Sequence, residues 1–180
     1  SPPDFPMPDN RWIADRLRLI EDASADFRGA KYLQALVLLL TRSLGVRFAM
    51  VSEAADASAE HGRAVAVADR EREGAPFFYD TADLPCRTVL GGTAVKIPCN
   101  AVELYPGVGE MTAYCGRPLR DANGTVTGLL AVEDSQAIER IDEIDDLLRL
   151  LAGRVAAELE CLRQMAERPA AAGTEAADTN

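Results

Sequence analysis

Small and apolar residues recur with helical spacing near the start of the chain. Five of them follow one another at alternating steps of four and three: Ile13, Leu17, Ile20, Ser24 and Phe27. This spacing predicts a helix over residues 11–27 with one narrow apolar stripe, which favours packing against a partner helix. Asp9 or Asn10 is placed to cap it. Residues 30–44 predict a second helix, more widely apolar, which ends at Gly45 and lies buried against a sheet.

A longer helical pattern occupies residues 137–167. Its apolar positions form a heptad-like series: Ile141, Ile144, Leu148, Leu151, Val155, Leu162 and Met165. Glu158 interrupts the series where an apolar residue is due. Because two such stripes lie at opposite ends of the chain, we expect the helices 11–27 and 137–167 to form a homodimer through a four-helix bundle. The alternative is that both stripes only cover one face of the sheet.

The middle of the chain predicts short strands. Residues 46–52 and 64–68 favour a hairpin, residues 77–79 and 94–97 favour short extended pieces, and residues 113–120 and 126–133 favour a central antiparallel pair. Asn123 and Gly124 tolerate positive φ in the turn of that pair. Pro85 begins a short helix over residues 85–90, and residues 99–105 predict another. We expect these irregular pieces to cover one face of the sheet.

The length of 180 residues, with 48% hydrophobic and 27% charged residues, indicates a single globular domain. Residues 1–9 contain four of the ten prolines and are expected to be mobile. Residues 168–180 are rich in alanine, threonine and acidic residues and are expected to form a disordered tail. The domain is therefore expected to span residues 10–167.

The net charge of −10 argues against two classes of partner. An acidic chain without a basic cluster repels phosphate backbones and anionic lipid surfaces, so we expect neither nucleic-acid binding nor direct membrane contact. The longest apolar stretch, residues 35–40, is too short to cross a bilayer, and the first residues do not resemble a signal peptide. These features predict a cytoplasmic location.

Histidine and cysteine offer little catalytic chemistry. The single histidine, His61, lies in a loop of small and charged residues and is expected to be an ordinary surface residue. The four cysteines, Cys86, Cys99, Cys115 and Cys161, form no CxxC pair, which predicts buried thiols rather than a disulfide framework or a metal site. Cys86 is the exception, since a thiol in the first helical turn after Pro85 faces unpaired amides that favour its thiolate.

An ordered set of motifs is similar to the GAF domain family of bacterial signalling proteins. The set comprises Tyr79-Asp80, then Leu84-Pro85-Cys86, then the glycine-containing hairpin from Gly116 to Asp134, within residues 30–165. The resemblance implies an α+β fold of the GAF/PAS type. It has a central, mostly antiparallel sheet of five or six strands, with the N- and C-terminal helices on one face and a ligand pocket on the other.

The resemblance also implies a function. It indicates a non-catalytic, small-molecule-sensing module of a bacterial signal-transduction protein, such as a two-component system, which signals through dimer helices. We expect the pocket wall to include Phe48, Met50, Phe78, Tyr79, Cys86, Leu104, Tyr105, Met111 and Tyr114, with Arg117 and Glu133 as polar contacts to an unidentified small molecule. The alternative is that these side chains only fill a core. The sequence identifies no catalytic residue, metal site or cofactor.

Two other functions stay open. One is a dimerisation and interaction module that binds no ligand. The other is a thiol-based redox sensor, or an enzyme similar to free methionine-(R)-sulfoxide reductase, a branch of the same fold. Cys115 lies inside the central strand 113–120, whereas the attacking cysteine of that enzyme branch lies on the loop before this strand, so the resemblance to the enzyme is poor.

Overall fold

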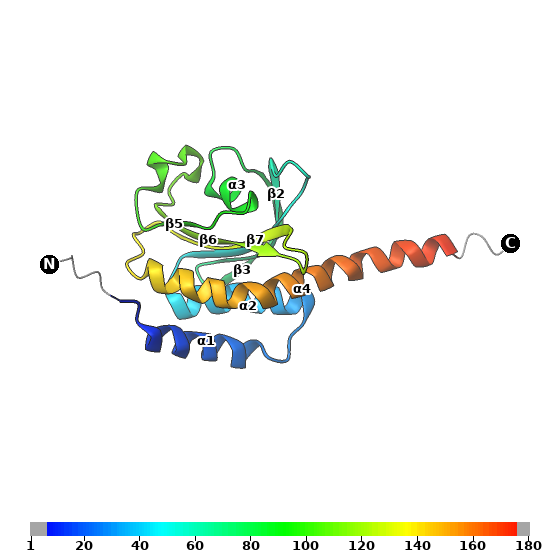
Figure 1. Cartoon of the computed structure of the whole chain (residues 1–180), viewed down its shortest axis with the longest axis horizontal. Coiled ribbons are helices and arrows are strands. Elements are labelled where there is room, and N and C mark those ends of the chain that lie inside the picture. Colours follow the sequence, from blue (N-terminus) through cyan, green and yellow to red (C-terminus); the bar gives the residue numbers. More distant parts are fainter. Residues whose placement is uncertain (1–6, 176–180) are drawn as a thin grey trace.

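The computed structural model describes residues 7–175, which form an α+β fold around one sheet (Figure 1). The helices are α1 (Asn10–Ser24), α2 (Gly29–Leu44), α3 (Pro85–Leu90) and α4 (Ile141–Glu175), with short 3-10 turns η1 (Ala101–Glu103) and η2 (Pro106–Val108). The strands are β1 (Phe48–Ala54), β2 (His61–Asp69), β3 (Arg72–Gly74), β4 (Phe77–Asp80), β5 (Val95–Ile97), β6 (Ala113–Arg120) and β7 (Val126–Asp134).

The strands form one antiparallel sheet in the order β3-β2-β1-β7-β6-β5, and β4 pairs with another part of β2. This confirms the expected mostly antiparallel sheet and its central β6–β7 hairpin. The sheet has seven strands rather than the five or six expected. The extra strand is β3, a polar segment without the apolar alternation from which a strand can be predicted. In the hairpin turn, Gly124 has a φ of +80° and the Asp121 carboxylate accepts hydrogen bonds from the N–H groups of Asn123 and Thr125.

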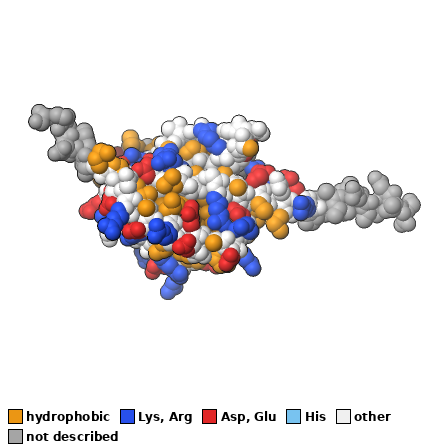
Figure 2. All heavy atoms as spheres, turned by 60° about the horizontal axis from the view of Figure 1, so that its bottom comes forward, with side chains coloured by type: hydrophobic (Ala, Val, Ile, Leu, Met, Phe, Trp, Pro, Cys, Tyr) orange, Lys and Arg blue, Asp and Glu red, His pale blue; other side chains and the backbone are white. Residues whose placement is uncertain are grey.

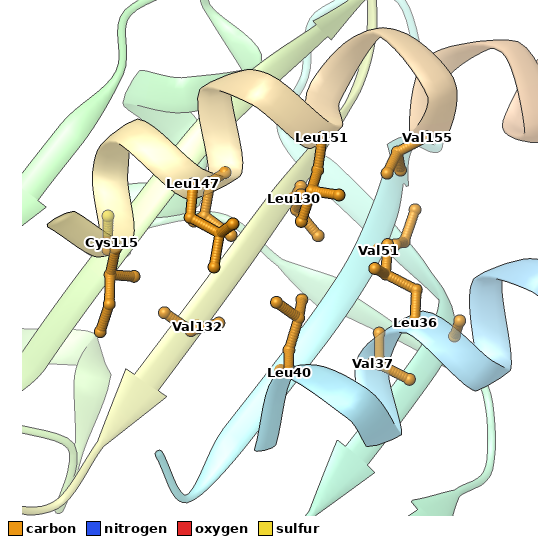
Figure 3. Close-up of a cluster of buried hydrophobic side chains, with 14 of the residues drawn as sticks. Leu36, Val37, Leu40, Val51, Cys115, Leu130, Val132, Leu147, Leu151 and Val155 are labelled. Atoms are coloured by element: carbon orange, nitrogen blue, oxygen red, sulfur yellow. The ribbon is translucent and has the colours of Figure 1, made fainter. Parts of the chain in front are cut away.

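Alternate residues of the central strands enter two separate apolar layers. On one face, Val51 of β1, Leu130 and Val132 of β7 and Cys115 of β6 pack with residues of α2 and α4. Figure 3 shows these side chains pointing toward Leu36, Val37 and Leu40 of α2 and toward Leu147, Leu151 and Val155 of α4. The opposite face carries the second layer, which contains the candidate site.

Helix α1 packs mainly on α2 and α4, as a further layer outside them (Figure 1). It begins after Asp9, whose side chain accepts a hydrogen bond from the Trp12 N–H, as the capping prediction required. Its stripe residues Ile13, Ile20 and Ser24 are buried within the chain. The apolar series at the start of α4 is buried in the same way. Most of each stripe therefore packs inside one chain, while the last residue of each, Phe27 and Met165, is 40% and 62% exposed.

The bounds of the last helix differ from expectation. α4 begins at Ile141 rather than at residue 137, and its backbone stays helical to Glu175, so residues 168–175 of the expected disordered tail are helical. The expected mobile segment and tail otherwise fall largely outside the described residues, which exclude 1–6 and 176–180. Among residues 7–175, no helix has both the length and the apolar character needed to cross a bilayer.

Glu158, which interrupts the apolar series of α4, caps the start of α2. Its Oε2 accepts a hydrogen bond of 2.6 Å from the buried N–H of Gly29, the first residue of α2. The residue before α2, Arg28, provides no side-chain cap of its own, and Arg154 lies 3.8 Å from the Glu158 carboxylate. A helix N-terminus leaves unpaired N–H groups and a partial positive charge, which a carboxylate satisfies. The Glu158 carboxylate therefore links α4 to the start of α2 by a hydrogen bond that an apolar residue at this position could not make.

Replacing Glu158 tests this role. We expect Glu158→Leu to lower the free energy of unfolding by about 1 to 2 kcal/mol, because the buried Gly29 N–H loses its acceptor. Glu158→Gln should lose less than half as much, since the amide oxygen still accepts. Urea denaturation measures both, with Glu160→Leu on the same helix as the control, expected within about 0.5 kcal/mol of the parent chain. A Glu158→Leu variant as stable as the parent would show that the apolar series matters more than the cap.

Candidate functional site

The face of the sheet opposite α2 and α4 is covered by α3, η1, η2 and the segments that join them. A cavity of about 160 Å³ lies between this cover and the sheet. It is lined by Phe48, Met50, Phe77, Tyr79, Leu84, Cys86, Gly107, Val108 and Glu133. The lining is mostly apolar and aromatic with one carboxylate, which is the usual character of a small-molecule site.

Strand register places the main cavity residues. Phe48 of β1 lies opposite Glu133 of β7, and Glu133 lies opposite Tyr114 of β6. These three residues therefore form one row across the three central strands, near the end where β1 and β6 begin, all on the cavity face. Met50 follows Phe48 by two positions and points to the same side. The row could not be read from the sequence because it depends on which strands become neighbours.

Two glycines make room for the tyrosines of the site. Gly62 of β2 is the register partner of Tyr79, and a Cβ at Gly62 would overlap the Tyr79 ring. A Cβ at Gly116 would likewise overlap the ring of Tyr114. The Tyr79 hydroxyl is 2.7 Å from the Ser52 hydroxyl, and the Tyr114 hydroxyl donates to the Cys86 sulfur at 3.7 Å. Both tyrosines thus have hydrogen-bond partners inside the chain.

Burial overrides the helix terminus at Cys86. The thiol is 3% exposed, and burial followed by the nearby Glu133 carboxylate raises its pKa from 9.0 to about 12. A helix N-terminus contributes about 0.3–1 kcal/mol, which is less than one pKa unit, so it cannot offset this shift. The expectation that the start of α3 favours a thiolate is therefore wrong. Burial also raises the pKa of Cys115, which lies on the opposite face beside Asp145.

Glu133 is the exceptional group of the cavity. Its side chain is partly buried, and burial alone raises its pKa from 4.5 to about 7. No hydrogen bond or salt bridge to its carboxylate is found within residues 7–175. The neighbouring Tyr79 and Tyr114 also have pKa values raised first by burial, so both stay neutral near pH 7. The cavity therefore holds one titratable carboxylate that has no counter-charge.

Five of the eleven expected site residues line the cavity. Phe48, Met50, Tyr79, Cys86 and Glu133 line the cavity, and the buried Tyr114 lies behind it. Tyr105 packs against the same apolar layer and its hydroxyl is 2.9 Å from that of Thr88, without lining the cavity. Met111 is partly buried and its N–H bonds the Val108 carbonyl, also outside the lining.

Three expected contacts are wrong. Phe78 is 73% exposed and lies beside Arg63, because the neighbours Phe77 and Tyr79 take the cavity face of β4 and alternation turns Phe78 away. Leu104 is 70% exposed in the irregular segment after η1. Arg117 lies on the helix face of β6, where its Nε and Nη2 each donate to the Asp145 carboxylate at 2.8 Å. Tyr114 takes the cavity face, so the residue three positions later faces α4.

Sequence reasoning missed four lining residues: Phe77, Leu84, Gly107 and Val108. Phe77 could have been found, since it lies two positions from Tyr79 on a short extended segment and so shares its face. Leu84 and Val108 lie on irregular connections, where no periodicity shows which side chain points inward. Gly107 packs its backbone against Asp83, whose carbonyl accepts its N–H.

Other parts of the surface offer less defined chemistry. A wider hollow of about 500 Å³ lies near Arg47, Arg70 and Asp134, but it is open and polar, and Arg47 is already paired with Glu110 at 2.9 Å. His61 is exposed and bonds Asp56, which raises the histidine pKa. No group of three or more potential metal ligands occurs in the part of the chain that the structure describes.

Comparison with known proteins gives this geometry a context. The sequence matched no protein-family model, and no curated protein was found to match it. Among solved structures, the GAF domain of a phosphoenolpyruvate-protein phosphotransferase from Coxiella burnetii is similar, with a TM-score of 0.69 and 16% identity over 88% of this chain and 99% of that one. The corresponding GAF domain from Acinetobacter gives a TM-score of 0.67 and 14% identity, covering 86% and 97%.

An enzyme is also among the similar structures. Free methionine-R-sulfoxide reductase from Neisseria meningitidis, in complex with its substrate, has a TM-score of 0.63 and 15% identity, covering 89% of this chain and 96% of that one. Since domains of a phosphotransferase and a reductase share this architecture, the likeness establishes the fold alone. The sheet, the helical layer and these structural relatives together show that the chain has the GAF domain fold.

Proposed function

We propose that this chain is a non-catalytic, small-molecule-sensing regulatory module of a bacterial signal-transduction protein, working in the cytoplasm and signalling through its terminal helices. The observation that carries the proposal is the unpaired Glu133 carboxylate in an aromatic cavity. Its folded-state pKa of about 7 means that ionisation at neutral pH opposes folding. A titratable group whose ionisation destabilises the fold, and which has no structural partner, is typical of a binding site.

The cavity favours a ligand sensor over an interaction module that binds no ligand. An interaction module needs only a filled core under the irregular segments, whereas a sensor needs space and polar groups beneath them. The site offers about 160 Å³ and a carboxylate that can accept hydrogen bonds. Both features support the sensor.

A thiol mechanism has less support. A nucleophilic or redox-sensing cysteine needs a thiolate, and a pKa of about 12 keeps Cys86 protonated at neutral pH. Cys115 is buried on the opposite face of the sheet. The similarity to a sulfoxide reductase therefore has no counterpart in an activated thiol at this cavity.

The strands connect the cavity with α4. Tyr114 and Glu133 face the cavity from β6 and β7, and Arg117 on the other face of β6 holds Asp145 of α4. Lys96 of β5 binds Asp142 in the first turn of α4 at 2.6 Å. A ligand that shifted these strands would act on the start of α4 directly. Such coupling requires the ligand to bind two arrangements of the helix unequally.

A homodimer is part of the proposal, but with a different interface from the buried stripes. α4 keeps a second, exposed face on which Leu150 is 48% exposed and Gly153 and Ala157 are exposed, at steps of three and four. Small side chains let another helix approach closely. Figure 2 shows the helical side of the molecule, where hydrophobic side chains gather among charged ones. α4 also extends past the sheet, as Figure 1 shows.

Filling the cavity tests the sensor. We expect native mass spectrometry of gently purified protein to detect a retained small molecule, and Val108→Trp to abolish retention because the indole occupies the cavity. Val102→Trp is the matched control, since Val102 is 50% exposed and outside the cavity. If the Val108→Trp chain retained the same molecule, or if the parent chain retained none and bound nothing from a metabolite panel, the proposal would fail.

The pH dependence of stability tests the state of Glu133. Because its folded pKa of about 7 exceeds the ordinary value of 4.5, the parent chain has the full stabilisation from protonated Glu133 below pH 4.5 and loses it as the pH rises through 7. Glu133→Gln stays neutral. Between pH 5 and pH 8 we expect the variant to gain about 2 to 3 kcal/mol over the parent in urea denaturation. His61 titrates in both chains, so the difference isolates Glu133. If the free energy of unfolding changed equally with pH in both chains, the Glu133 carboxylate would not be desolvated in the folded state.

A charge on the exposed face of α4 tests the dimer. We expect the parent chain to run as a dimer in light scattering and Ala157→Arg to run as a monomer, since an arginine blocks close helix approach. Ala82→Arg, on the cavity side of the molecule, should leave the dimer intact. A monomeric parent, or a dimer unaffected by Ala157→Arg, would rule out this interface.

A further inference from the structure

We infer that the cavity binds a small organic cation, an ammonium with an apolar body, with Glu133 as its counter-ion and Phe48, Phe77 and Tyr79 as its aromatic wall. This inference rests on the proposed sensor function and names its ligand class. It is carried by three features of the described residues: uncompensated charge, aromatic lining and size.

The charge around Glu133 favours a cation. The titratable groups that face it are Tyr79 from β4, Cys86 from α3 and Tyr114 from β6, and burial keeps all three protonated and neutral at pH 7. Arg47 lies directly before β1, and its guanidinium pairs with Asp69 and Glu110 at 3.5 and 2.9 Å. Within residues 7–175, no lysine or arginine pairs with the Glu133 carboxylate. An anionic ligand would add a second uncompensated negative charge, whereas a cation would remove the first.

Hydrogen bonding points the same way. The Tyr114 hydroxyl already donates to Cys86, and the Tyr79 hydroxyl is paired with Ser52. The ionised carboxylate of Glu133 is an acceptor only, and its acceptor sites are free of partners in the described chain. A ligand that fits this pattern brings a positive charge or N–H donors and needs few acceptors of its own.

The aromatic wall strengthens the preference. Phe48 lies directly opposite Glu133 in the β1–β7 pairing, and the rings of Phe77 and Tyr79 are 5.8 Å apart at 56°. All three rings line the cavity. Aromatic rings attract cations through their quadrupoles, most strongly when water is excluded. Sites lined by several aromatic rings are known to bind quaternary ammonium ligands.

The size of the cavity limits the ligand. At about 30 Å³ for each water molecule, 160 Å³ has room for about five waters. This matches an organic cation with a similar small number of non-hydrogen atoms and is too little for a nucleotide or a tetrapyrrole. The apolar residues Met50, Leu84 and Val108 complete the lining and suit an alkyl body.

Calorimetric titration with a matched pair of probes tests the inference. Choline and 3,3-dimethyl-1-butanol have nearly the same shape, but only choline is charged. We expect choline to bind the parent chain at least about tenfold more tightly than the alcohol at pH 8. We expect choline affinity to fall about tenfold at pH 6, where Glu133 is mostly protonated. Propylammonium and tetramethylammonium are titrated in the same way to test smaller cations.

The Glu133→Gln variant identifies the counter-ion. We expect it to lose the pH dependence and most of the preference for choline over the alcohol, keeping only the part that the aromatic wall contributes, while Val102→Trp keeps the parent behaviour. Equal binding of both probes to the parent, no binding of any ammonium probe, or an unchanged preference in Glu133→Gln would overturn the inference. A different molecule retained in native mass spectra and displaced by Val108→Trp would then still support the sensor, so the two failures are distinguishable.

Discussion

The central strands β1, β7 and β6 are buried on both faces, and the rest of the structure depends on this constraint. Because side chains alternate, every second residue must suit the helical layer and every other residue must suit the cavity layer. Val132 packs toward α2 and α4 while its neighbour Glu133 faces the cavity. Cys115 and Tyr114 divide in the same way on β6. One pair of strands thus joins the candidate site to the candidate output helix.

Desolvation decides the chemistry of the site. It outweighs the helix terminus at Cys86, where it raises the pKa of the thiol to about 12, and it raises the pKa of the Glu133 carboxylate to about 7. The glycines at positions 62 and 116 contribute to the same environment, since they let two tyrosine rings cover the sheet where a larger residue would push them away. Near pH 7 the titratable groups around the cavity are therefore neutral except for one carboxylate.

The sequence predicted the elements better than the faces. α3 runs from Pro85 to Leu90 as expected, because a proline at the first turn and glycines at the end define a short helix locally. The sequence predicted β6 and β7 as a central antiparallel pair, but not which alternate residues face the helices, so Arg117 was assigned to the wrong side. In β4, three consecutive aromatic residues, Phe77, Phe78 and Tyr79, give no contrast from which to choose a face. The cap formed by Glu158 depends on a contact 129 residues away, which only the fold creates.

Carbon-13 NMR titration of the Glu133 carboxyl group in the ligand-free chain measures the central feature directly. Burial without a counter-charge gives a titration midpoint near 7, and a bound ammonium ion should move that midpoint downward. A midpoint near the ordinary value of 4.5 in the ligand-free chain would contradict the structure of the site, because water or a cation would then already stabilise the carboxylate.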